Sequence, residues 1–95
     1  MAINTDSNIT ADSTTTPYAY PGGPGAAIAT GTFDGATVEL EISLDGTNYA
    51  PVGNESILFQ PNLFAIGDIP ACDMRWKISN AGASTSVTLS IEDRG

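Results

Sequence analysis

The chain has 95 residues, with three basic and eleven acidic side chains, no histidine and one cysteine, and a net charge of −8. Binding to phosphate backbones or to anionic lipid needs Lys and Arg, so this balance excludes nucleic-acid and membrane-surface binding. The N-terminus lacks the basic and apolar regions of a secretory signal, and no run reaches the roughly 20 apolar residues of a membrane span. We therefore expect one small domain, made in the cytoplasm and stabilised by association.

Residues 1–25 are predicted to form an extended polar arm that ends in a hinge. Up to Thr16 the arm is rich in Thr, Ser, Asn and Asp, and its sizeable apolar residues are Ile3 and Ile9. Such a segment cannot offset the entropy of ordering by itself. We expect a neighbouring subunit to hold it through Ile3 and Ile9. The alternative is that the arm lies across its own domain as an edge strand.

The hinge is the segment PYAYPGGPG, residues 17–25, which holds three prolines and three glycines. This composition disfavours both a helix and a central strand. Tyr18 and Tyr20 are two residues apart and share one side of an extended chain. They are candidates for an aromatic contact with a partner, or they cover the edge of their own core.

Residues 26–95 are predicted to form the body, and its clearest element is a β-hairpin from Thr37 to Val52. Four apolar residues alternate with polar ones, which places them on one face of a strand: Val38, Leu40, Ile42 and Leu44. Asp45 and Gly46 then form the turn, because Gly tolerates positive φ and Asp bonds its own backbone. The hairpin has one buried and one solvated face.

Other strands are predicted on both sides of this hairpin. Residues 26–33 form a weak strand with Ile28 and Phe33 as its larger members, and residues 63–66 form a short apolar piece before a loop at residues 67–70. The continuous apolar run from Ile57 to Phe59 suits a strand buried on both sides or at a subunit contact.

Two further segments alternate, residues 73–79 and 86–92. They direct six apolar side chains inward: Met74, Trp76, Ile78, Val87, Leu89 and Ile91. Six or so short strands joined by Gly, Asn, Asp and Pro turns predict an all-β fold, a small antiparallel β-sandwich or jelly roll.

The outward charges on two of these strands have opposite signs. Glu39 and Glu41 lie on one, and Arg75 and Lys77 on the other. If the strands are neighbours, the charges pair across the sheet and fix its register.

Candidate chemistry is weak throughout. The spacing of Glu39 and Glu41 resembles an inverting glycosidase pair, but neither lies in a predicted cleft. Asp45 begins a sequence that resembles a calcium loop, with Glu55 as a later ligand, although a hairpin turn explains it better. Without histidine, Cys72 has no activating base and no zinc site can form, and we expect it to be a small buried residue. We therefore predict no enzyme activity, no cofactor and no metal.

The run GTFDGATVELEISLDGTNYAPVG, residues 31–53, resembles a segment of small β-structured virion proteins of tailed bacteriophages. The matching elements are a GTF-G-A opening, a TV-L strand, an S-DG-T-Y hairpin and a V-G exit. MRWKISNAGASTSVTLSIE, residues 74–92, is similar to the closing strands of the same group. The first 25 residues lie outside the resemblance.

This resemblance implies a capsid decoration (cement) protein, a jelly roll that trimerises on the outer capsid and binds the major capsid protein or other virion subunits. Candidate partner contacts are Ile3, Ile9, Tyr18, Tyr20, Ile57 and Phe59. Each copy would bridge shell subunits, and many weak contacts would sum by multivalency. The alternatives are a carbohydrate- or surface-binding sandwich module, which includes a tail or head-fibre accessory protein, and a bacterial adhesin subunit, which the missing signal sequence disfavours.

Overall fold

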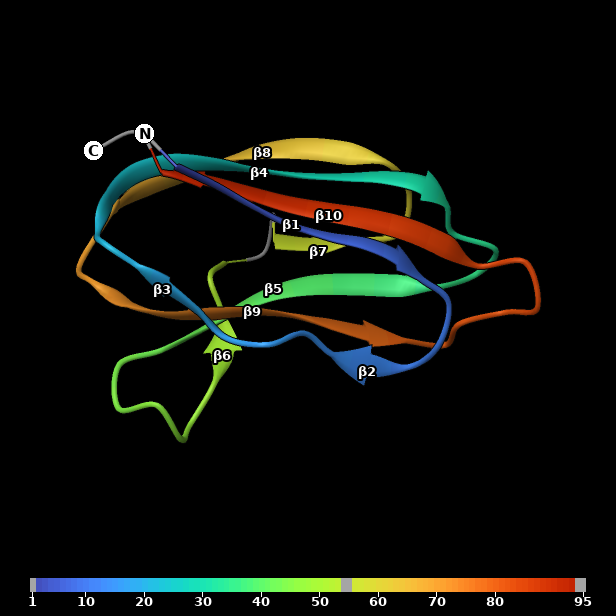
Figure 1. Ribbon diagram of the computed structural model, residues 1–95, viewed down its shortest axis with the longest axis horizontal. Coiled ribbons are helices and arrows are strands. Elements are labelled where there is room, and N and C mark those ends of the chain that lie inside the picture. The colour runs from blue at the N-terminus through green and yellow to red at the C-terminus, as the bar shows by residue number, and fades with distance from the viewer. Residues whose placement is uncertain (1, 54–55, 94–95) are drawn as a thin grey trace.

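The computed structural model describes residues 2–53 and 56–93, and these residues form an all-β sandwich of two antiparallel sheets (Figure 1). One sheet has four strands in the order β1-β10-β4-β8, and the other has six. The strands are β1 (Ala2–Ile9), β2 (Ser13–Thr14), β3 (Tyr18–Tyr20), β4 (Gly23–Thr32), β5 (Thr37–Ser43), β6 (Ala50–Pro51), β7 (Ile57–Leu58), β8 (Asn62–Ile69), β9 (Cys72–Ser79) and β10 (Ser86–Asp93). None of these residues forms a helix long and apolar enough to cross a membrane.

The six-stranded sheet is built around β5 and β9, whose sequences alternate between apolar and polar residues. They pair antiparallel from Thr37 opposite Ser79 to Ser43 opposite Asp73. The short strands β2 and β3 extend the sheet beyond β9, and β6 and β7 extend it beyond β5. The inward residues of β9 are buried as predicted, with Met74, Trp76 and Ile78 at most 2% exposed.

The four-stranded sheet contributes the opposite wall of the core. Its second strand, β10, directs Val87, Leu89 and Ile91 inward, again as predicted. Its third strand, β4, buries the small side chains of Ala27 and Ala29 and directs the larger Ile28 outward. Small inward residues leave room in the core for larger side chains.

The N-terminal segment is built into both sheets of its own domain. β1 pairs with β10 as an edge strand of the four-stranded sheet, while β2 and β3 pair with β9 (Figure 1). Of the two alternatives drawn from the sequence, the structure has the edge strand. A polar segment can occupy an edge because one side of such a strand stays solvated.

The expectation that residues 17–25 contain no central strand is wrong: residues 18–20 form β3 and residues 23–25 begin the central strand β4, with Pro21 and Gly22 between the two strands. Pro24 lies in β4, where the register shifts between Gly23 opposite Ile69 and Gly25 opposite Ile66. At a bulge the ladder of backbone hydrogen bonds is interrupted, so a proline, which has no amide hydrogen to donate, is tolerated there. Gly25 is required at this point, because a Cβ would lie 2.5 Å from both the Glu92 carbonyl oxygen and the Tyr20 hydroxyl.

Three predicted strand boundaries also need correction. The hairpin of β5 and β6 is present, but β5 ends at Ser43, so Leu44 lies in the turn and is 74% exposed rather than inward. The run from Ile57 to Phe59 forms only the two-residue β7. Phe59 lies beyond the end of this strand, and its side chain is exposed. Residues 67–69, predicted as loop, continue β8, because pairing with β4 extends as far as Ile69.

Candidate functional site: an apolar groove on the four-stranded sheet

The outer face of the four-stranded sheet brings together apolar side chains that are far apart in the sequence. Register fixes two rows across it. The first row is Ile3, Glu92, Ala26 and Ala65, and the second is Thr5, Ser90, Ile28 and Leu63. Because directly opposite residues of antiparallel strands point to the same face, each row is a line of neighbouring side chains.

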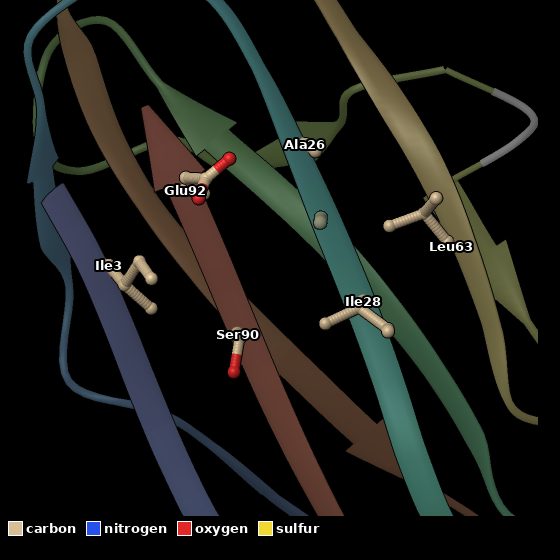
Figure 2. A pocket seen from close by; sticks show the side chains of 7 residues that line it. Ile3, Ala26, Ile28, Leu63, Ser90 and Glu92 are labelled. Carbon is tan, nitrogen blue, oxygen red and sulfur yellow. The ribbon is translucent and has the colours of Figure 1, made fainter. Parts of the chain in front are cut away.

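A groove runs along this face between large side chains. Ile3 lies on one side and Ile28 and Leu63 lie on the other, as Figure 2 shows. Ser90 of β10 lies between Ile3 and Ile28, and Ala26 lies next to Ile28 on the same face of β4. Because Ser90 and Ala26 are small, they leave a hollow of about 280 Å³. Ile3 is 65% exposed, Leu63 60% and Ile28 38%, so three aliphatic side chains face solvent around one depression.

This face is also poor in charge. Among the described residues that line the groove, Glu92 alone is charged. In a chain with a net charge of −8, such a surface is unusual. Depletion of charge together with exposed apolar side chains is typical of the centre of a protein interface.

The six-stranded sheet has the opposite character. The predicted cross-strand pairs are confirmed there, with Arg75 Nε 2.9 Å from Glu41 Oε1 and Lys77 Nζ 3.9 Å from Glu39 Oε1. The Arg75 guanidinium also stacks over the Tyr49 ring, 3.8 Å from its centre. Because each carboxylate has a cation beside it on a sheet face, these residues serve the sheet rather than a glycosidase cleft.

The predicted partner contacts are dispersed in the structure. Ile3 lies in the groove, but Ile9 packs against the core at the far end of β1. Phe59 is 70% exposed, next to the half-buried Ile57 of β7. Neither of these two residues lines the groove.

Tyr18 and Tyr20 cover the edge of their own core, which is the second of the two interpretations that the sequence left open. Their rings are 6.5 Å apart in an edge-on arrangement, and Tyr20 is only 1% exposed. The Tyr18 hydroxyl donates to Asp93 Oδ2 at 3.4 Å, and the Tyr20 hydroxyl donates to the Gly23 carbonyl at 2.7 Å. Burial, followed by the nearby Asp93 charge, raises the pKa of both phenols.

The Asp45 carboxylate is occupied by its own turn. Oδ1 accepts from the backbone amides of Thr47 and Asn48 at 2.8 Å and from the Ser43 hydroxyl at 2.9 Å, while Oδ2 accepts from the Asn48 side chain. The two backbone bonds are the main reason why the pKa of Asp45 lies well below its usual range. This bonding is that of a hairpin turn. The other predicted calcium ligand, Glu55, lies outside the described residues.

Within residues 2–53 and 56–93, no three His, Cys, Asp or Glu side chains are grouped so as to hold a metal ion. Cys72 is half-buried at the start of β9, beside a second hollow of about 420 Å³ that also touches Leu44 and Asp45. Burial, with a smaller contribution from the Asp73 charge, raises the pKa of the Cys72 thiol. A raised pKa lowers the thiolate fraction and so makes the thiol less nucleophilic.

Of the seven described residues that line the groove, the sequence predicted only Ile3 as a contact; the six others include Ile28, Leu63 and Ser90. The sequence places Ile28 in a weak strand and Leu63 in a short apolar piece, and no local pattern shows that these residues are neighbours. A search of family models, curated proteins and solved structures finds no match to this chain.

Proposed function

We propose that the chain is a non-enzymatic structural virion protein, a capsid decoration (cement) protein that bridges and stabilises neighbouring shell subunits. The observation that carries the proposal is the groove face, where Ile3, Ile28 and Leu63 are exposed on a surface with little charge. The resemblance of residues 31–53 to small virion proteins of tailed phages supplies the class of partner, a major capsid protein or another virion subunit.

Docking through the groove face explains why the two sheets differ on their outer sides. The ion-paired side of the six-stranded sheet suits contact with water, while the groove face loses little electrostatic solvation when another protein covers it. One groove of about 280 Å³ offers only a small contact. Strong attachment would therefore come from many copies on one shell, each adding a weak contact.

The alternative, a carbohydrate-binding module, needs exposed aromatic rings around a groove. Trp76 is fully buried, and Arg75 covers a face of the half-buried Tyr49 ring. The groove itself is lined by aliphatic and small side chains. An aliphatic surface gives sugar rings no stacking platform, so the groove favours a protein partner.

The test uses heads of the virus that encodes the chain, prepared without this protein. Purified chain is added back, and its co-sedimentation with the heads and the temperature of head rupture are measured. We expect saturable binding and a higher rupture temperature. Ile28→Asp places a charge in the groove and should weaken binding at least tenfold, an effect of about 1.4 kcal/mol or more.

Thr14→Asp is the matched control, because Thr14 is an exposed residue of β2 in the other sheet, away from the groove. It should bind like the wild type, and circular dichroism should show that both variants are folded. Absence of binding to the heads would refute the proposal. If the isolated chain instead binds glycans on an array, the carbohydrate-binding alternative would replace it.

A further inference from the structure

The free edge of β8 differs from the other sheet edges. In the six-stranded sheet the outer segments β2, β3, β6 and β7 have only two or three residues each, a common way to prevent edge pairing. β8 has eight residues, NLFAIGDI, and lies at the end of its sheet. β1, at the opposite end, is polar and irregular, with Asn8 at a φ of 56°.

The backbone of β8 is open to another strand. The Leu63 amide donates to the side chain of the preceding residue, Asn62 Oδ1, at 2.8 Å. Such a local bond is typical of an amide that has no strand beside it. In an antiparallel ladder alternate residues direct their amides to the same side, so Ala65 shares the free edge with Leu63.

Gly67 lies in a bulge of β8, because residues 67 and 68 stand between Ile66, opposite Gly25, and Ile69, opposite Gly23. Its φ is not in the left-handed region, and a Cβ built on it would meet nothing within 4 Å. A glycine inside a strand often marks a bulge, so the regular part of the free edge is residues 62–66.

We propose that two copies of this chain pair through β8, antiparallel, about a two-fold axis at Ala65. In this register Ala65 faces its own counterpart, and Leu63 faces Gly67 of the second copy, so that a large side chain lies opposite the smallest. On the inner side, the half-buried Phe64 faces Ile66 of the second copy, which joins the two cores.

The occupant is a second copy because the strand is complementary to itself. A two-fold interface uses the same patch twice, and residues 63–67 meet that condition in both shape and polarity. The stretch is uncharged, and Asp68 lies beyond it, so two chains of net charge −8 can approach here. This dimer differs from the trimer implied by the resemblance, and it does not depend on shell binding.

The test is the mass of the full chain by sedimentation velocity over a range of concentrations. The wild type should form a dimer of the 9.8 kDa chain. Ala65→Glu places two like charges opposite each other at the axis, which should weaken the dimer about tenfold. Ala65→Lys should do the same. A mixture of the two variants should recover the dimer, because only a two-fold axis at Ala65 pairs each charge with its opposite.

The control is Ser7→Glu, which places the same charge on the exposed face of β1 at the other edge. It should leave the dimer unchanged. A wild-type monomer at about 100 μM, an assembly that Ala65→Glu does not alter, or a mixture that fails to recover the dimer would each overturn the proposal. Ala65 is outside the groove lining, so failure here leaves the shell-binding test unaffected.

Discussion

Replacing Arg75 by Met tests how the six-stranded sheet is held together. Glu41 is 6% exposed, and its Oε1 lies 2.9 Å from Arg75 Nε. The variant leaves this buried carboxylate without its cation and also removes the stacking on Tyr49. The neighbouring pair of Lys77 and Glu39, at 3.9 Å with the lysine side chain 49% exposed, provides a built-in comparison.

The expected loss of stability follows from burial. Breaking a buried ion pair costs about 3–5 kcal/mol, because one charge stays uncompensated. The Arg75 side chain is 28% exposed, so in the variant water partly solvates the Glu41 carboxylate in place of the guanidinium. The lower end of that range therefore applies. Loss of the stacking adds up to about 1 kcal/mol. We expect about 3 kcal/mol for Arg75→Met and less than about 1 kcal/mol for Lys77→Met.

The assay is urea unfolding followed by the fluorescence of Trp76, which is fully buried in the folded chain. A double variant, Arg75→Met with Glu41→Leu, should recover most of the loss, because no unpaired charge remains. Equal losses for Arg75→Met and Lys77→Met would refute the reasoning. So would a double variant no more stable than Arg75→Met alone.

Further predictions concern two glycines and one carboxylate. Gly25→Ala should cost about 2 kcal/mol, because its Cβ would meet the backbone of Glu92, whereas Gly67→Ala should leave the folded monomer unchanged or about 0.4–1 kcal/mol more stable. The two variants are compared by their urea unfolding midpoints, measured at a protein concentration below that at which copies of the chain associate. The lowered pKa of Asp45 means that its contribution to stability is complete above the unfolded value of about 3.8 and is lost as the pH falls below it. Asp45→Ala should therefore flatten the loss of urea resistance between pH 5 and about pH 2, and an unchanged slope would contradict this.

The sequence was sufficient for strands whose two faces differ in polarity. In β9, Trp76 and Ile78 alternate with Arg75 and Lys77, and burial follows that alternation. The same parity predicted which charges pair across the sheet. Where one face of a strand meets the core and the other meets water, period-two patterning is a sufficient signal.

The sequence was not sufficient where small or polar residues form a strand. β4 buries Ala27 and Ala29, whose weak apolar character hides the inward face, and it directs Ile28, one of the two larger members of the predicted strand, outward. The groove depends on register between four strands, with Ile28 opposite both Ser90 and Leu63. Register between distant segments is a tertiary property that no local pattern encodes.

The position of β10 has a consequence for synthesis of the chain. This strand lies between β1 and β4, so β1 has no neighbour in its sheet until residues 86–93 have been synthesised. At about 5–20 residues per second, that delay is roughly 4–16 s. During it, β1 and one side of β4 remain unpaired, so nascent chains on neighbouring ribosomes could exchange strands. The polar sequence of β1 would then protect the nascent chain against misassembly.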